Sequence, residues 1–357
     1  MVAGAWVAGD IEVEDGVLTR VGLPSTGGGS VLPGLVDLQV NGYGGVDVNA
    51  ADADGARTAL RALARDGVLH VQPTVITDAE DVVVRQLAMF RDLPPVAGGA
   101  RVVGVHAEGP FLSPDHRGVH RPEHLRDPDR SILERFLAAG PLRTVTVAPE
   151  LPGAIPFISW ASRRGVIVQA GHSGADAATA YAAFDAGARA VTHLFNGMAH
   201  LQRREPGIVG AALARQDVAI QLIADDIHLA RETATIALRV AEPRTMLVTD
   251  ASSAAGAGDG TFTVGGFEVT VTDGVPRLPD GTLAGSTVTL LQQVGRLVEH
   301  GWPVDRAANL ASRQPARFFD LPPHAGELRV GGPADLVVVD EEFAIRGVHL
   351  RGEELVP

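Results

Sequence analysis

The sequence contains no cysteine, and all 30 of its basic residues are arginine, so it has no lysine either. The absence of cysteine excludes disulfides and thiolate metal sites. The absence of lysine excludes a carboxylated lysine that bridges two metals, and it excludes a lysine Schiff base. Any metal site in this chain must therefore use other ligands.

Positive charge and long apolar runs are also scarce. The net charge of -13 argues against a nucleic-acid or anionic membrane surface, although a local arginine with backbone N–H groups can still hold a small anion. No apolar run approaches the ~20 residues that span a bilayer. The opening segment MVAGAWVAGD lacks a basic region, so we expect no signal peptide and a cytoplasmic protein.

The 357 residues suffice for one large domain and a small one. Short Val/Ile-rich runs alternate with helix-like segments, which indicates a parallel sheet covered on both faces. The number of units favours an α/β fold of the (β/α)8 barrel type over an open sheet. The clearest strand-like runs are 101–107, 143–149, 165–171, 188–194, 218–224 and 244–250.

The two ends of the chain differ from its middle. Residues 1–31 and 321–357 are rich in strand and turn signals, and we expect them to pair into a small β-sandwich domain. The catalytic barrel is then expected over residues 32–320, with a hairpin insertion near residues 259–285.

Polar residues follow four of the apolar runs at once: Glu108, His172, His193 and Asp250. In a barrel these strand ends open on one face, where enzymes of this fold carry their chemistry. Glu108, His172 and His193 would form a three-ligand metal site, with Asp250 beside the metal-bound water. Each could alone be a cap, turn or loop residue, but four at four strand ends are harder to explain separately.

Two amides raise a question of their own. Gln39 and Asn41 point to the same side at the end of the apolar run LVDLQV, although amides are costly to bury without partners.

A second polar cluster lies downstream of His193. Asn196 and Gly197 with Arg204 suit a phosphate, or they belong to an ordinary solvated loop. His120 and His228, taken alone, are also typical of loop histidines.

Taken together, these segments resemble the N-acetylglucosamine-6-phosphate deacetylases of the amidohydrolase superfamily. The resemblance runs in order from about residue 32 to 320. The segments that carry it are PGLVDLQVNGYGG, HAEGPFLSPDHRGVH, GHSGAD, THLFNGM, REPG, IADDIH, VTDASSAAG and LAGSTVTL.

The resemblance implies one divalent metal per chain, most readily Zn2+, with Fe2+, Mn2+ or Co2+ as alternatives, on Glu108, His172 and His193. Gln39 and Asn41 stand where many amidohydrolases have the His-x-His of a second metal. Amides are poor ligands for such ions, so we expect both to hydrogen-bond to metal-bound water or to neighbouring ligands.

The resemblance also implies the reaction. Asp250 acts as general base and then general acid for a metal-bound water, and His228 with the metal polarises the acetyl carbonyl. The products are D-glucosamine 6-phosphate and acetate. His120 is expected to contact a sugar hydroxyl, and Arg204 with the backbone of Asn196 and Gly197 to hold the phosphate.

Two alternatives remain at this point: another metal-dependent amidohydrolase acting on a different amide, or a sugar-phosphate-binding protein that has lost catalysis. The resemblance further implies a homodimer. It leaves open how the site treats mannosamine or galactosamine substrates. Asp226 stands where the family pattern has glycine, and its charge is expected to act on His228.

Overall fold

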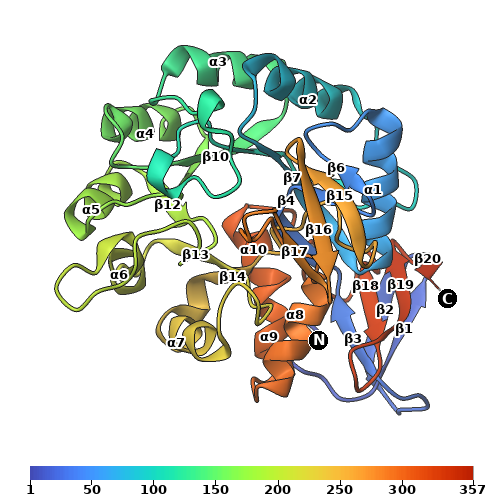
Figure 1. The fold of residues 1–357 in the computed structure, drawn as a ribbon. Coiled ribbons are helices and arrows are strands. Elements are labelled where there is room, and N and C mark those ends of the chain that lie inside the picture. The colour runs from blue at the N-terminus through green and yellow to red at the C-terminus, as the bar shows by residue number, and fades with distance from the viewer. Residues whose placement is uncertain (357) are drawn as a thin grey trace.

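The structure is a computed structural model that describes residues 1–356, and its centre is a parallel β-barrel (Figure 1). Successive strands around the barrel are hydrogen-bonded in the order in which they occur along the chain, and the short β8 (Arg101–Val102) pairs beside β7. The barrel strands are β4 (Leu35–Val40), β7 (Val68–Ile76), β9 (Val105–Glu108), β10 (Leu142–Val147), β11 (Ile167–Ala170), β12 (Ala188–Val191), β13 (Ala219–Leu222) and β14 (Thr245–Leu247).

The barrel closes where the segment after β14 meets β4. The Asp250 N–H donates to the Gln39 carbonyl at 3.0 Å. Asp37 supports the same seam, because its carboxylate accepts from the backbone N–H and the hydroxyl of Thr249. This seam places the end of β4 next to the segment that carries Asp250.

Helices cover the outside of the barrel strands (Figure 1). Side-chain caps fix where some of them begin: Asp52 accepts from the Gly55 N–H, and Thr289 forms a capping box with Gln292. None of the helices described is long and apolar enough to cross a membrane. Their bounds are α1 (Ala53–Arg65), α2 (Glu80–Asp92), α3 (Arg130–Ala139), α4 (Ala154–Ser162), α5 (Ala177–Asp185), α6 (Gly207–Ala214), α7 (Arg231–Ala241), α8 (Leu290–Glu299), α9 (Val304–Leu310) and α10 (Arg313–Phe318), with 3-10 turns at Pro114–His116, Pro122–His124 and Glu242–Arg244.

The inside of the barrel is polar. Gln72 of β7 donates to Thr144 of β10 at 2.9 Å, which crosses the interior because β9 separates these two strands. Thr146 of β10 likewise lies 2.9 Å from Thr192, which follows the non-adjacent strand β12. Many of the apolar residues in these strands therefore face the helices, although each run as a whole resembles a fully buried strand.

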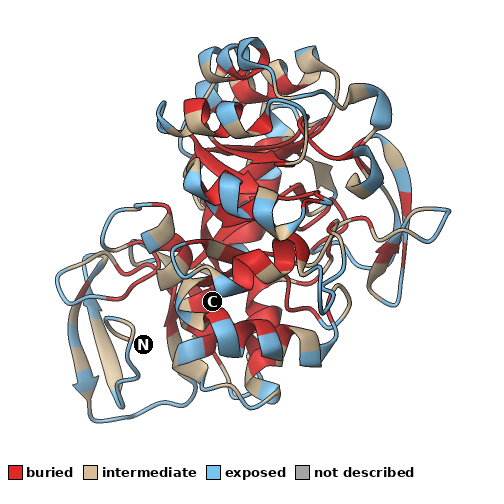
Figure 2. Cartoon of the chain, turned by 90° about the vertical axis from the view of Figure 1, so that its left-hand side faces the viewer, coloured by how far each residue is buried: buried red, intermediate tan, exposed pale blue. Residues whose placement is uncertain are grey.

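Antiparallel sheets flank the barrel. One contains β20 (Glu353–Val356), β19 (Ile345–Leu350), β18 (Leu336–Val339) and β3 (Ser30–Pro33), and a second pairs β1 (Asp10–Glu14) with β2 (Val17–Leu23). They bring the two ends of the chain together and are more exposed than the barrel (Figure 2). Further strands are β5 (Gly42–Tyr43) with β6 (Val46–Asp47), and the antiparallel set β15 (Gly260–Val264), β16 (Phe267–Thr272) and β17 (Val275–Arg277).

This arrangement confirms the predicted fold class, a (β/α)8 barrel with a β-structure built from both termini. The predicted domain boundaries, 1–31 with 321–357 and 32–320, stay predictions.

The buried Asp37 makes the stability of the barrel depend on pH. Burial raises the pKa of its carboxyl to about 7, against an ordinary value near 4 in an unfolded chain. Between these values the folded chain keeps a proton that the unfolded chain has lost. Asp37 therefore stabilises the fold fully below pH ~4, and this contribution is lost as the pH rises toward 7.

The Asp37→Asn variant isolates this effect, since asparagine has the same shape and does not titrate. We expect wild-type protein to lose stability relative to Asp37→Asn as the pH rises from about 4 to about 7. Urea unfolding of both proteins across this range measures the difference in free energy. A difference that stays constant with pH would contradict the raised pKa.

Candidate active site

Glu108 is the centre of the candidate site. It ends β9, and its Oε1 lies 3.1 Å from His172 Nε2 and 2.9 Å from His193 Nε2. All three residues are buried, and their ligand-type atoms lie within 4.8 Å of one another. The structure thus brings together three of the residues that the sequence placed at separate strand ends.

The backbone turns sharply where these side chains leave the strands. His172 follows β11 with φ of 47°, His193 follows β12 with φ of 25°, and Asp250 follows β14 with φ of 51°. Non-glycine residues rarely adopt positive φ, and such strain gathers at functional sites. These turns aim the side chains across the carboxyl end of the barrel.

The hydrogen bonds of the cluster indicate that a cation belongs in it. His172 Nδ1 lies 2.8 Å from the His116 carbonyl and must donate to it, which in a neutral ring leaves Nε2 as an acceptor facing the Glu108 carboxylate. Two acceptors at 3.1 Å need a positive charge between them. The donor set of two imidazole nitrogens and a carboxylate therefore fits a divalent metal.

The pKa values around Glu108 agree with this reading. Although burial opposes both shifts, contact with the two imidazoles holds the pKa of Glu108 well below its usual range. Contact with Glu108 likewise raises the pKa of His193 to about 9. Without a metal the carboxylate thus holds a proton on His193, and a bound metal takes the place of that positive charge.

Gln39 and Asn41 donate hydrogen bonds to the carboxylates of the site. Gln39 Nε2 donates to Glu108 Oε1 at 3.1 Å and to Asp250 Oδ1 at 3.0 Å, and Asn41 Nδ2 donates to the same Asp250 oxygen at 2.7 Å. Ionised carboxylates only accept, so these contacts fix which end of each amide is the NH2 group. The NH2 groups of both amides thus find their partners at the end of β4, whereas Gln39 Oε1 and Asn41 Oδ1 are buried without a partner among the described residues.

Asp250 is held by one of its two oxygens. Because Oδ1 accepts from both amides, any proton transfer falls to Oδ2. Burial, together with the charge of Glu108, raises the pKa of Asp250 above its ordinary value. A raised pKa brings a carboxyl closer to the range in which it both accepts and returns a proton near neutral pH.

His120 lies inside the cluster. It is buried, its Nδ1 accepts from the Thr77 N–H at 3.3 Å, and its Nε2 lies 3.9 Å from Glu108 Oε2. Burial lowers the pKa of His120 to about 3, so the ring is neutral and carries its proton on Nε2. The closeness of His120 to Glu108 could not be predicted from the sequence, and contact of His120 with a sugar hydroxyl stays a prediction.

His228 has a partner that sequence reasoning missed. Its Nδ1 lies 2.7 Å from Oδ2 of the buried Asp225, whose other oxygen accepts from the Ile227 and His228 N–H groups. Asp226 pairs with His300 at 3.2 Å, and its expected action on His228 stays a prediction. The spacing of three residues between Asp225 and His228 was the available signal.

The three residues expected to bind a phosphate are assembled less completely than the three expected metal ligands. The Asn196 N–H already donates to the His193 carbonyl at 3.0 Å. Gly197 packs against His172, where a Cβ would come within 2.7 Å of Nδ1. Arg204 is exposed on the loop before α6. Phosphate binding by these three residues stays a prediction.

Comparison with known proteins agrees with the geometry. Residues 30–355 match the Amidohydrolase family. The chain is 35% identical to N-acetylgalactosamine-6-phosphate deacetylase of Escherichia coli O157:H7, covering 90% of this chain and 87% of that protein. It is 36% identical to human N-acetylglucosamine-6-phosphate deacetylase, covering 92% and 83%.

A solved structure is similar over nearly its whole length. It is a variant of N-acetyl-D-glucosamine-6-phosphate deacetylase from Mycobacterium smegmatis in complex with N-acetyl-D-glucosamine-6-phosphate. The TM-score is 0.90 at 33% identity, with 97% of this chain and 94% of that chain covered.

The metal-binding role of Glu108 can be tested by Glu108→Gln, which keeps the shape and removes the charge. We expect about one divalent metal per wild-type chain and at least about tenfold weaker binding in the variant. Elemental analysis after dialysis against a metal buffer measures both. The exposed Glu123→Gln is the matched control. Equal metal content in wild type and Glu108→Gln would remove Glu108 from the ligand set.

Proposed function

The chain belongs to the amidohydrolase family, and on that basis we propose that it hydrolyses the acetamide of N-acetyl-D-glucosamine 6-phosphate to D-glucosamine 6-phosphate and acetate. The observation that carries this proposal is the convergence of His172 and His193 on one oxygen of Glu108. Asp250 is tied to that carboxylate through Gln39. A binding protein has no need for a base beside a metal site.

Glu108, His172 and His193 would hold the metal. Zinc suits two imidazole nitrogens and a carboxylate, and iron, manganese or cobalt are compatible with the same ligands. When bound, the metal supplies Lewis acidity, which makes a water more acidic and a carbonyl more electrophilic.

Asp250 does the proton transfer in the proposed mechanism. Its Oδ2 accepts a proton from the water that attacks the acetyl carbon, while Gln39 and Asn41 hold Oδ1 in place. The same oxygen then returns the proton to the departing amine nitrogen, so that the amino sugar leaves as a neutral amine. The raised pKa of Asp250 suits both halves of this exchange.

His228 and Asp225 act on the carbonyl oxygen. To stabilise the negative charge that develops there, His228 must donate from Nε2 while Nδ1 donates to Asp225. Such a doubly protonated ring is a cation, and the buried Asp225 carboxylate supplies its counter-charge. Arg204 would bind the phosphate and so fix the acetyl group over the metal site.

Measured acetate release decides which sugar epimer is the preferred substrate, since the relatives include a galactosamine as well as a glucosamine enzyme. We also propose a homodimer and a cytoplasmic location.

Acetate release tests the substrate and the phosphate clamp together. We expect rapid release from N-acetylglucosamine 6-phosphate and little from unphosphorylated N-acetylglucosamine. Arg204→Ala should lower kcat/KM for the phosphorylated sugar by about tenfold or more, since a charge-assisted contact is lost. It should leave the slow reaction of the free sugar unchanged. The epimeric N-acetylgalactosamine 6-phosphate is measured beside both. Equal losses of kcat/KM on both glucosamine substrates would argue against a phosphate clamp. The absence of acetate release from either phosphorylated sugar would overturn the proposed activity.

Asp250→Asn tests the base. The variant should fold and bind metal like the wild type, because asparagine keeps the shape of the side chain, while kcat falls by roughly a hundredfold or more. Circular dichroism and elemental analysis check fold and metal content. Normal turnover in a metal-loaded Asp250→Asn protein would remove Asp250 from the mechanism.

A further inference from the structure

The antiparallel set β15, β16 and β17 takes no part in the mechanism proposed above. The turn between β15 and β16 consists of Gly265 and Gly266, which have the positive φ, 54° and 78°, that a tight hairpin turn of this kind requires. The turn reaches the carboxyl end of the barrel, because the Gly265 N–H donates to Asp47 Oδ2 at 2.8 Å and a Cβ on Gly265 would clash with Ile76. Ile76 pairs with Glu108, so the hairpin stands beside the candidate site, next to β7 in Figure 1.

Arg121 joins this turn to the loop that carries His120. Its Nε donates to the Gly265 carbonyl at 3.3 Å, and its Nη2 donates to the Gly266 carbonyl at 3.0 Å. The same guanidinium lies over the ring of Phe267, 4.8 Å from the ring centroid. A planar fork that donates to two carbonyls and lies on a ring is held in one orientation. Arg121 thus fixes the backbone directly after His120 to the hairpin.

Val119, on the other side of His120, is anchored to the same hairpin. It is half-buried and packs against a small apolar cluster. The other members of this cluster come from β15, β16 and the segment that follows them: Val264, Val269, Leu278 and Ala284. Both neighbours of His120 in the chain therefore contact one element that lies outside their own loop.

The position of the His120 ring depends on how this loop is held. The ring accepts from the Thr77 N–H at 3.3 Å, which is long for a hydrogen bond of this kind. The His120 carbonyl accepts from the Arg117 side chain at 2.9 Å, but Arg117 belongs to the same irregular loop. A side chain that binds substrate must be held to within about 0.5 Å, so the contacts with the hairpin bear directly on the site.

We propose that Arg121 is a positioning residue: by docking its loop on the hairpin, it places the His120 ring where a sugar hydroxyl can bind. The inference rests on the proposed function, in which His120 contacts the sugar. The contacts of Arg121 described above include none of the expected metal ligands, so its loss should leave metal binding intact.

Arg121→Ala tests this role in two backgrounds, wild type and His120→Ala. In the wild-type background, kcat/KM for the preferred phosphorylated sugar should fall by about threefold to tenfold, as expected for one lost hydrogen bond, and KM should rise. In the His120→Ala background, the same substitution should change kcat/KM by less than about twofold, since the contact that Arg121 positions is already gone. Arg126→Ala is the matched control, because this exposed arginine of the same loop donates to the Glu123 and Leu125 carbonyls.

Metal content and Tm check that each variant is folded and loaded. Four results would overturn the inference: equal losses from Arg121→Ala in the two backgrounds, a loss no larger than in Arg126→Ala, a loss confined to kcat, or full activity in His120→Ala. If Arg121→Ala does not fold, Arg121→Gln, which keeps the inner part of the aliphatic stem, decides in its place. Acetate release by the wild type separates the two levels of the argument. Its absence overturns the proposed function together with this inference, whereas wild-type release with any of the four results removes only the positioning role.

Discussion

One oxygen of Glu108 has three nitrogens within 3.1 Å, from Gln39, His172 and His193. A carboxylate buried at this depth is stable only when positive charge and hydrogen-bond donors surround it. The rest of the site follows from that requirement. The strained turns bring two imidazoles to the oxygen, and the Gln39 amide donates to it from β4 while Gln39 and Asn41 together hold Asp250. The arrangement of the proposed catalytic residues thus follows from the need to stabilise one buried carboxylate.

Much of this could be predicted from the sequence because the ligands follow apolar strands directly. A parallel barrel gathers all its carboxyl ends on one face, so Glu108, His172 and His193 had to meet if the fold was right. The polar interior of the barrel could not be predicted in the same way. Gln169 stands between Val168 and Ala170, and a short run of this kind reads as apolar although one face of it is not.

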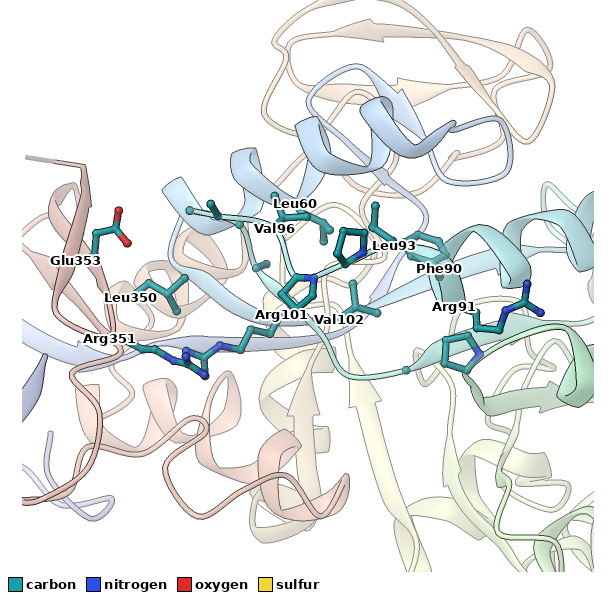
Figure 3. Close-up of a pocket in the computed structure, with 18 residues that line it drawn as sticks. Leu60, Phe90, Arg91, Leu93, Val96, Arg101, Val102, Leu350, Arg351 and Glu353 are labelled. Carbon is teal, nitrogen blue, oxygen red and sulfur yellow. The ribbon is translucent and has the colours of Figure 1, made fainter.

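What could not be predicted depends on side-chain direction and long-range packing. Asp225 and Asp226 are adjacent, and only the backbone decides which carboxylate reaches His228 and which reaches His300. His120 lies in an irregular loop, where no periodicity indicates depth. A cavity at the far end of the barrel from Glu108 is lined by residues as distant in the chain as Leu60 and Glu353 (Figure 3).

The hydrogen bonds that close the barrel also determine when Asp250 acquires its amide donors. Asn41 and Asp250 are 209 residues apart, and their hydrogen bond forms only when the segment after β14 meets β4. Contacts between such distant positions form late, since a long loop must close first. A folding intermediate with every other strand paired would carry Glu108 and both histidines but leave Asp250 without its donors. In such a chain the metal ligands would be assembled before the proton-transfer machinery, so that catalytic competence reports the closure of the barrel.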